Sequence, residues 1–409
     1  MVAKRRFLFL QGPCTPFYAR LVDRLHADGH AVCKIHFNAG DAVYLSGGDS
    51  IAFRDAPDHL KDFLDRIYRD LGITDQILFG DQRPVHRPAV AHGEVFGVRT
   101  HVFEEGYFRP YWVTLEREGV NGHSLLPRDP DWFRVTGERL PAAPEPAPFH
   151  APFRVRALHD VAYHLAGLAN PLLFPGYRTH APIIAPVEYA GYLKRFSWLK
   201  MIRRREFSRM QSLAASGRPY FVLPLQLNTD AQIRDHSRFE HMEEVIDYVL
   251  ESFSRHGPND AVMAIKNHPL DMGLSDFAGE IRKCARRYGL TGRVEYFEDG
   301  DLALLLRQAK GVVTVNSTVG MLALEMGIPT VTLSDPIYNL PGLTFQGSLD
   351  GFWPACDQPD RALFEAFRKV VMHATQVNGG FYCRRGMALA AENASRVLTA
   401  DVSPLEALL

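Results

Sequence analysis

Two adjacent carboxylates follow one of the apolar runs in this sequence and could take part in proton transfer. In "FEEGYFRP", Glu104 and Glu105 precede Gly106 and lie among aromatic residues. A turn of this kind in a partly apolar site suits general acid/base work. An ordinary surface turn explains the same residues, so this cluster alone leaves both interpretations open.

A second polar cluster, "LPLQLNTDAQIRDHS", follows an apolar run that ends near Leu223. Capping of a helix by Asn228 or Asp230 would account for one or two of its polar residues. The cluster is larger than that, so we expect a site with several hydrogen-bonding groups and one carboxylate. Its polar members are Gln226, Asn228, Thr229, Asp230, Gln232, His236 and Ser237.

A third cluster, "AIKNHPLD", places Lys266, Asn267 and His268 directly after another apolar run. Pro269 holds the preceding histidine in an extended conformation. A single histidine is most often an ordinary surface or core residue. Next to a lysine at a strand end, His268 is also suited to contact a phosphate or to donate a proton.

The fourth cluster lies in "VTVNSTVGMLALEMGIPTVTL", residues 313–333, which reads as a strand, a polar turn, a helix and a strand. Asn316, Ser317 and Thr318 form the turn, and Gly320 lies one turn into the helix pattern. These side chains could simply cap the helix. The same free amides could also hold an anion, so the two interpretations are compatible.

The elements that must position these clusters are predicted by the hydrophobic pattern. Strands and helices alternate twice along the chain, which indicates parallel sheets covered by helices on both faces. In the first half, we expect strands at 5–12, 31–38, 76–81 and 98–108 and helices at 16–30 and 59–73. In the second half, we expect strands at 219–227, 260–269 and 292–298 and helices at 241–257, 277–290 and 301–310, followed by the stretch 313–333.

The fold class predicted from this pattern is α/β, with two Rossmann-like doubly wound domains that face a central cleft. Ligands of such sheets bind at the carboxyl ends of the strands, where all four clusters fall. We expect an N-terminal domain at 1–215, a C-terminal domain at 216–375, and a helical segment at 376–409 that packs back on the N-terminal domain.

Composition excludes several classes of protein. A chain of 409 residues is long enough for two domains, and its formal net charge of -1 gives no support to nucleic-acid binding. The five cysteines are scattered, which favours a reducing cytoplasm over a zinc or disulfide framework. No segment approaches the roughly 20 apolar residues of a membrane span. We therefore expect a cytoplasmic protein that is at most peripherally attached to a membrane.

Familiar cofactor and metal motifs are also missing from the sequence. There is no P-loop, no dinucleotide-binding glycine fingerprint, no G-x-S-x-G elbow and no spacing that suggests a metal site. We expect no cofactor and no metal. A phosphate would instead be held by a helix N-terminus, hydroxyl groups, histidine and lysine.

A basic and aromatic connector separates the two halves. Residues 141–152, "PAAPEPAPFHAP", cannot form regular secondary structure. Residues 189–211 then combine aromatic side chains with a basic cluster and read either as a solvated helix or as a helix at an anionic membrane surface. The residues concerned are Tyr192, Lys194, Arg195, Phe196, Trp198, Lys200, Arg203, Arg204 and Arg205.

With these clusters in order, the chain resembles the bacterial capsule polysaccharide synthesis family, which contains the KpsS- and KpsC-type β-Kdo transferases. The resemblance covers most of the chain except the connector at 141–211. Its length is more similar to the single-module KpsS branch than to the two-module KpsC branch. The motifs that carry it are "FLFLQGPCTPFYARLVDRLHADGHAVCKIHFNAGD", "FEEGYFRP", "LPLQLNTDAQIRDHS", "KNHP" and "VNSTVGMLALEMGIPTV".

A more distant similarity links the acid-acid-Gly, His-Pro and Ser/Thr elements to bacterial sialyltransferases, which have a GT-B fold and use a CMP-activated sugar acid. That similarity implies a GT-B fold here, with Glu105 as the acid/base near the acceptor. It also implies that His268, Ser317 and Thr318 contact the CMP phosphate, whose developing charge the site must stabilise.

The family resemblance further implies net retention at the anomeric carbon, because a β-linked donor gives β-linked products. Double displacement requires a carboxylate nucleophile. Asp230 is the first candidate, Asp235 the second and Glu104 a distant third. Lys266 or Arg234 could pair with the carboxylate of the sugar.

The resemblance implies CMP-Kdo as donor and an anionic, phosphatidylglycerol-type lipid as acceptor, onto which the first Kdo of a capsule linker is placed. A lipid acceptor favours the membrane-surface interpretation of 189–211 and a location at the inner-membrane face. Other capsule synthesis and export proteins are expected partners. Two alternatives stay open, namely another CMP-nonulosonate donor or a glycan acceptor, and a non-catalytic capsule export or assembly factor.

Overall fold

The protein is described by a computed structural model in which residues 4–44, 49–178, 185–228, 233 and 237–409 are placed. Its chain divides into two compact units. Unit 1 consists of Met1–Pro127, Thr136–His180 and Arg368–Leu409. Unit 2 consists of Arg128–Val135 and Ala181–Phe367. Helices α5 (Pro130–Arg139) and α15 (Arg361–Thr375) each run from one unit into the other.

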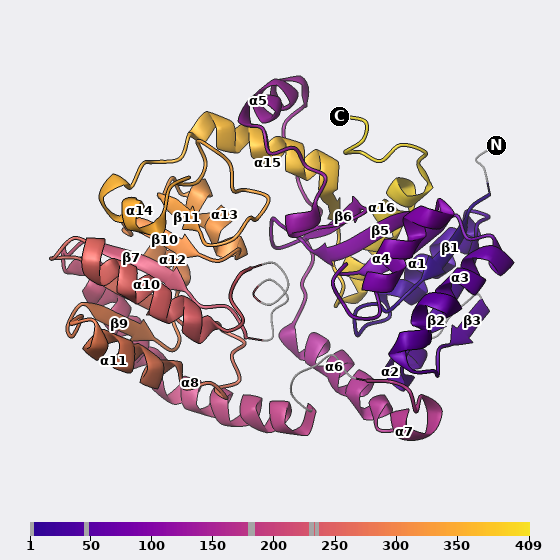
Figure 1. The fold of residues 1–409 in the computed structure, drawn as a ribbon, viewed down its shortest axis with the longest axis horizontal. Coiled ribbons are helices and arrows are strands. Elements are labelled where there is room, and N and C mark those ends of the chain that lie inside the picture. The colour runs from indigo at the N-terminus through magenta and orange to yellow at the C-terminus, as the bar shows by residue number, and fades with distance from the viewer. Residues whose placement is uncertain (1–3, 45–48, 179–184, 229–232, 234–236) are drawn as a thin grey trace. The chain divides into compact units, whose positions relative to one another are not determined.

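Unit 1 contains a seven-stranded sheet in the order β12-β6-β5-β4-β1-β2-β3 (Figure 1). The strands from β5 to β3 in this order are parallel, whereas β6 and β12 are antiparallel to their neighbours. The strands are β1 (Arg6–Phe9), β2 (Ala31–His36), β3 (Asp49–Ala52), β4 (Asp75–Phe79), β5 (Arg99–Glu105), β6 (Trp112–Arg117) and β12 (Gln376–Asn378).

Helices cover both faces of this sheet because side chains alternate between the two faces of each strand. Phe7 and Phe9 pack with α1 and α16, whereas Leu8 and Leu10 pack with α3 and α4. The helices of unit 1 are α1 (Phe17–Ala27), α2 (Ala39–Val43), α3 (Leu60–Leu71), α4 (Arg87–Gly93), α6 (Phe153–Gly167), α7 (Asn170–Leu173) and α16 (Arg384–Thr399). Short 3-10 turns lie at Pro57–His59, Glu94–Phe96 and Asn121–His123.

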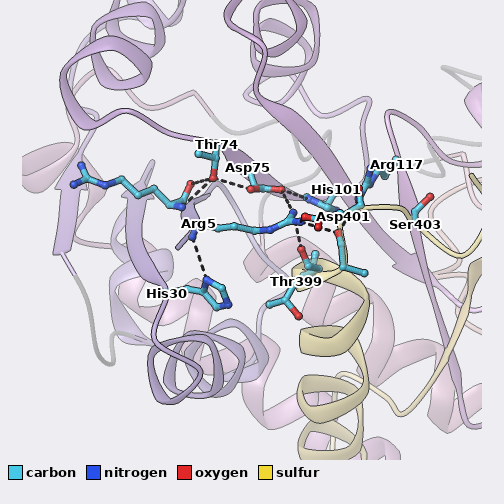
Figure 2. Close-up of polar contacts among 12 residues, drawn as sticks. Arg5, His30, Thr74, Asp75, His101, Arg117, Thr399, Asp401 and Ser403 are labelled. Atoms are coloured by element: carbon cyan, nitrogen blue, oxygen red, sulfur yellow. Dashed lines mark hydrogen bonds and ion pairs between the residues drawn. The ribbon is translucent and has the colours of Figure 1, made fainter. Parts of the chain in front are cut away.

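A buried ion-pair network ties the C-terminal end of the chain to the amino ends of the strands in unit 1 (Figure 2). The Arg5 guanidinium lies 3.1 Å from Asp75 Oδ1, and His101 Nε2 lies 2.8 Å from the same oxygen. Arg5 also donates to the carbonyl groups of Leu398 and Ala400 at the end of α16. The Arg5 guanidinium therefore makes its bonds to Leu398 and Ala400 only when the C-terminal helix is docked.

Unit 2 contains a five-stranded sheet in the order β11-β10-β7-β8-β9, and all its pairings are parallel. The strands are β7 (Tyr220–Pro224), β8 (Val262–Lys266), β9 (Val294–Phe297), β10 (Gly311–Thr314) and β11 (Thr330–Thr332). The helices are α8 (Ala185–Ala215), α10 (Met242–His256), α11 (Phe277–Arg287), α12 (Leu302–Leu306), α13 (Thr318–Glu325) and α14 (Leu349–Ala355).

Two hydrophobic cores fill the two faces of the unit 2 sheet. Phe221 and Leu223 pack with α10, α11 and α14, whereas Tyr220 and Val222 pack with α8, α12 and α13. The α/β fold class and each strand and helix predicted in the two halves are confirmed. The sequence pattern did not predict β3, β6 or β12, and it did not predict the antiparallel edge of unit 1.

The division into units differs from the predicted boundaries at helix α8 and at residues 128–135 and 368–375. Helix α8 belongs to unit 2, although the sequence analysis placed residues 189–211 in the N-terminal domain. The reason is apolar packing, since Met210 and Leu213 lie in the core beneath β7 and β10. The segment 376–409 supplies β12 and α16 to unit 1, with α16 against α1. Residues 141–152 form no helix or strand.

Candidate functional site

Three neighbouring strands of unit 2 end at the same edge of the sheet and bring polar residues together there. Gln226 follows β7 and is 4% exposed, and its amide group donates to Asn316 Oδ1 at 3.1 Å. Asn316 follows β10. In the sheet, β7 lies between β10 and β8. Two of the clusters predicted from sequence are therefore in direct contact.

The loop after β8 holds His268 in a defined orientation. The backbone N–H of His268 donates to Asn267 Oδ1 at 2.8 Å, and His268 Nδ1 lies 3.1 Å from the backbone N–H of Leu270. Because Nδ1 accepts that bond, the neutral imidazole carries its proton on Nε2. In this tautomer, Nε2–H of His268 is a hydrogen-bond donor.

Lys266 and Asn267, which were predicted to bind the donor, are buried and hold the loop that carries His268. They are 5% and 2% exposed. Lys266 Nζ donates to the carbonyl of Asn267 at 2.8 Å, and Asn267 Nδ2 donates to Asp271 Oδ2 at 2.9 Å. Burial lowers the pKa of Lys266 to about 8, which further disfavours an exposed, permanently charged contact. Both side chains stabilise the loop that carries His268.

Arg195 on α8 supports the same loop from a distant part of the sequence. It forms an ion pair with Glu298, and its guanidinium lies 3.8 Å from Asp271. Its side chain is 9% exposed. Arg195 is therefore removed from the predicted membrane-facing set, because a buried, paired guanidinium is not available to a lipid surface.

The other residues of that set lie on the exposed part of α8. Lys194, Lys200, Arg204 and Arg205 are exposed, and Trp198 is 49% exposed. Arg203 is exposed as well, with its Nε 2.9 Å from Asp299 Oδ2. The basic, aromatic surface predicted from sequence thus persists without Arg195.

The turn after β10 is a capped helix start. Ser317 is the N-cap of α13, and its hydroxyl oxygen accepts the N–H of Val319 at 3.2 Å. Thr318 is the first residue of this helix and is half-buried. Gly320 has a packing role, since a Cβ at this position would lie 2.4 Å from the hydroxyl of Tyr338. The missing side chain of Gly320 therefore makes room for Tyr338 next to the start of the helix.

The cluster after β7 is only partly within the described residues. The amide of Asn228 donates to Glu243 and Ser275, and its oxygen accepts the N–H of Met242, so Asn228 anchors the start of α10. Ser237 donates to the carbonyl of Ile233. Thr229, Asp230, Gln232, Arg234, Asp235 and His236 lie outside the described residues.

A second group of functional side chains lies in unit 1, at the carboxyl end of β5. Glu105 is the last residue of that strand, and the hydroxyl of Tyr382 donates to its Oε1 at 2.9 Å. Glu104 accepts the backbone N–H of Glu105 at 3.0 Å. Burial and the nearby Glu105 carboxylate raise the pKa of Tyr382 well above its usual value, so the phenol stays protonated and donates.

Arg156 of α6 completes this group. Its guanidinium stacks over the Tyr382 ring at 4.3 Å and lies 3.9 Å from Glu105 Oε1. The Glu105 carboxylate thus lies next to two donor groups, the phenol of Tyr382 and the guanidinium of Arg156. Neither Arg156 nor Tyr382 was predicted. Both residues are far from Glu105 in the sequence, and neither belongs to a recognisable sequence motif.

Two further findings concern metal ligation and membrane spanning in the part of the chain that the structure describes. There, no group of three or more His, Cys, Asp or Glu side chains is arranged to hold a metal ion. None of the helices within the described ranges is both long and apolar enough to cross a bilayer.

Comparison with known proteins shows to which family the chain belongs. A family model described as "Capsule polysaccharide biosynthesis protein" matches residues 74–382. The capsule polysaccharide export protein KpsS of Escherichia coli is 34% identical over 388 residues, which cover 93% of this chain and 98% of that protein. The capsule polysaccharide modification protein LipB of Neisseria meningitidis serogroup B is 36% identical over 387 residues, which cover 92% and 91% of the two chains.

Among solved structures, the Thermosulfurimonas dismutans KpsC β-Kdo 2,7 transferase aligns with a TM-score of 0.46 at 15% identity, covering 97% of this chain and 99% of that one. The family model covers most of the chain, and the two relatives are each more than 30% identical over nearly its whole length. The chain therefore belongs to the capsule polysaccharide biosynthesis protein family.

Proposed function

We propose that the chain is a retaining β-Kdo glycosyltransferase of the GT-B class, which transfers Kdo from CMP-Kdo to a (lyso)phosphatidylglycerol acceptor and so starts the poly-Kdo linker of a capsule. The observation that carries the proposal is the convergence of His268, Ser317 and Gln226 at one edge of the unit 2 sheet in a member of a capsule biosynthesis family. This edge is where parallel α/β sheets bind ligands.

In this proposal, unit 2 binds the donor. Nε2–H of His268 donates to the phosphate of CMP, and the hydroxyls of Ser317 and Thr318, with the first amides of α13, hold the same group. The phosphate is the leaving group, and its negative charge grows as its bond to the sugar breaks. Donors that are already fixed in place stabilise that charge without reorganising.

The proposed chemistry has two displacements and balances without a metal. A carboxylate, for which Asp230 is our first candidate, attacks the anomeric carbon, and CMP leaves with the electron pair of the broken C–O bond. Glu105 of unit 1 then takes the proton of the acceptor hydroxyl, whose oxygen attacks the same carbon and displaces the carboxylate. Two inversions give net retention.

One assay separates this proposal from its alternatives, which are another CMP-nonulosonate donor or a glycan acceptor, and a non-catalytic export or assembly factor. Release of CMP from CMP-Kdo is measured with and without lyso-phosphatidylglycerol. The proposal predicts release that is stimulated by the lipid. Release from a different CMP-sugar, or only with a glycan, would favour the first alternative, and no release under any combination would reject both enzyme functions.

His268 offers a direct test of the donor role. Replacing His268 with alanine is expected to lower turnover about 100-fold, because the transition state loses a charge-stabilising donor. His268→Gln, which keeps an N–H donor, is expected to retain more activity than the alanine variant. The control is His241→Ala, since His241 is exposed and makes no side-chain capping bond. Equal turnover in His268→Ala and wild type would contradict the assignment.

We also propose that the protein works at the cytoplasmic face of the inner membrane, with the exposed basic and aromatic surface of α8 attracted to anionic lipid. Changing Arg203, Arg204 and Arg205 together to glutamate is expected to weaken co-sedimentation with phosphatidylglycerol vesicles, because each cation near an anionic surface contributes about 1 kcal/mol. Unchanged binding of the triple variant would reject this role for α8. Other capsule synthesis and export proteins are proposed partners, and nucleic acid is not.

A further inference from the structure

Helix α6 of unit 1 has the reverse of the usual amphipathic arrangement. A surface helix normally buries an apolar stripe and exposes its polar side. None of the 15 residues of α6 is buried, and its polar contacts with the rest of unit 1 include those of Arg156, His159 and Tyr163. The inner face of α6 contacts unit 1, and its outer face is exposed.

The inner face of α6 is polar and is anchored to the carboxyl-end loops of the unit 1 sheet. The hydroxyl of Tyr163 donates to the buried Asp41 carboxylate at 2.8 Å, and His159 Nδ1 lies 2.9 Å from the hydroxyl of Tyr44. Arg156, His159 and Tyr163 are spaced by three and four residues and so share one side of the helix. These contacts fix the position of Arg156.

Arg156 has donors available in this fixed position. Stacking on Tyr382 at 4.3 Å holds its guanidinium, which is 3.9 Å from Glu105. Within the described ranges it makes no hydrogen bond, and its side chain is 43% exposed. A guanidinium offers five N–H donors in a planar fork that matches a phosphate or a carboxylate. The Arg156 guanidinium is therefore already placed to bind an anionic group next to Glu105, the proposed base.

The outer face of α6 continues into α7 and is apolar. Leu158, Leu165 and Leu172 are 68%, 60% and 85% exposed, and Leu168 is 74% exposed. Leu158 and Leu165 are seven residues apart on α6 and share one side of that helix, Leu168 is its C-cap, and Leu172 lies on the short helix α7 that follows. An exposed apolar surface of this kind indicates contact with a lipid phase or a protein.

Charge favours an anionic bilayer as the occupant of this face. Besides Arg156 on the inner face, residues 153–178 contain two arginines, Arg154 and Arg178, and one acidic residue, Asp160. Asp160 lies 3.7 Å from His164 on the same helix. Apolar side chains flanked by cations are typical of segments that lie in the interface of anionic membranes.

We propose that α6 and α7 form the site at which an anionic lipid acceptor is held: the leucines of the outer face enter the apolar phase, and Arg156 binds the headgroup phosphate so that its hydroxyl is presented to Glu105. This inference rests on the proposed transferase function and assigns residues to its acceptor. The carboxylate of a soluble glycan could also pair with Arg156, but a soluble glycan would not cover the exposed leucines of the outer face.

The outer face is tested with vesicles of phosphatidylglycerol and phosphatidylcholine. The triple variant Leu158→Ser/Leu165→Ser/Leu168→Ser is expected to bind mixed vesicles about tenfold more weakly, because three exposed apolar side chains are lost from the interface. The matched control replaces Val95, Leu125 and Val402, which are 75%, 45% and 54% exposed, with serine. Unchanged binding, or conversion of a dimer to a monomer without loss of vesicle binding, would overturn the proposal.

The inner face is tested with a short-chain lyso-phosphatidylglycerol below its micelle concentration. Arg156→Gln is expected to weaken binding measured by calorimetry about tenfold, whereas binding of an uncharged monoacylglycerol is unchanged. The control is Arg69→Gln, because Arg69 is exposed and also stacks on an aromatic ring, 5.5 Å from the centre of Phe96. Equal binding by Arg156→Gln and wild type, or a preference for a Kdo oligosaccharide over the lipid, would overturn the assignment.

These binding measurements require no donor sugar, so they separate the two possible failures. If the wild-type protein releases no CMP from any CMP-sugar but the α6 variants still lose lipid binding, the transferase proposal fails and the lipid site stands. If CMP release is intact and both sets of variants bind lipid normally, the lipid site fails and the transferase proposal stands.

Discussion

Replacing Asp75 with alanine is expected to destabilise unit 1 by about 3–5 kcal/mol, the largest effect on stability that we predict. Asp75 is fully buried, and its carboxylate pairs with Arg5, which is 3% exposed, and with His101 (Figure 2). Removing the carboxylate leaves the Arg5 charge buried without its buried counter-ion. The same guanidinium holds the end of α16, so docking of the C-terminal segment is expected to weaken as well.

The control for this prediction is Asp401→Ala. Asp401 pairs with the same Arg5 at 2.9 Å, but it is 89% exposed, so its loss is expected to cost less than about 1 kcal/mol. Hydrogen exchange of peptides from β1, β4 and α16 measures the opening free energy of unit 1 separately from that of unit 2. A similar loss of opening free energy in Asp75→Ala and Asp401→Ala would show that burial of the Arg5–Asp75 pair does not determine its contribution to stability.

The same network predicts that acid destabilises unit 1. Burial lowers the pKa of His101 below its usual 6.5, despite the hydrogen bond to Asp75. The unfolded chain then binds this proton at a higher pH than the folded protein, so stability is complete above about pH 6.5 and falls as the pH decreases. Burial alone would raise the pKa of Asp75, but His101, Thr74 and Arg5 bring it below its usual 3.8, which adds a loss at lower pH.

Replacing Asp230 with alanine is expected to abolish transfer, with turnover reduced by about 10⁴-fold or more if it is the nucleophile of a double displacement. The residue follows β7 in a cluster whose described members include Gln226 and Asn228, which hydrogen-bond to Asn316 and Glu243. CMP binding is expected to persist, because the proposed phosphate contacts are His268, Ser317 and Thr318.

Intact-mass measurement distinguishes Asp230 from the other carboxylates. With donor alone, the wild-type protein is expected to gain one Kdo, and peptide mapping is expected to place it on Asp230. The matched control is Asp235→Ala, five residues away in the same cluster, which is expected to keep the adduct. An adduct on Asp235 or Glu104 would reassign the nucleophile, and an inverted product without any adduct would reject double displacement.

The local sequence pattern was enough to predict most of the secondary structure and several residues of the candidate site. The alternation of apolar strands and amphipathic helices predicted both sheets, because the periods of 2 and 3.6 residues are properties of short segments. It also placed Gln226, Asn316 and His268 at strand ends, and parallel pairing makes those ends meet. The Ser317 cap was predictable for the same reason, since capping involves residues only two or three positions apart.

Only the tertiary structure decided the contacts between distant segments. Tyr382 and Arg156 meet Glu105 because β12 joins the unit 1 sheet and α6 crosses its carboxyl-end loops. Arg195 changed from a predicted membrane contact to a buried support of the His268 loop, because α8 packs on unit 2. Sequence shows how polar a side chain is and how residues are spaced, but it does not show which distant segment will cover it. That partner determines whether a charge faces water, lipid or another charge.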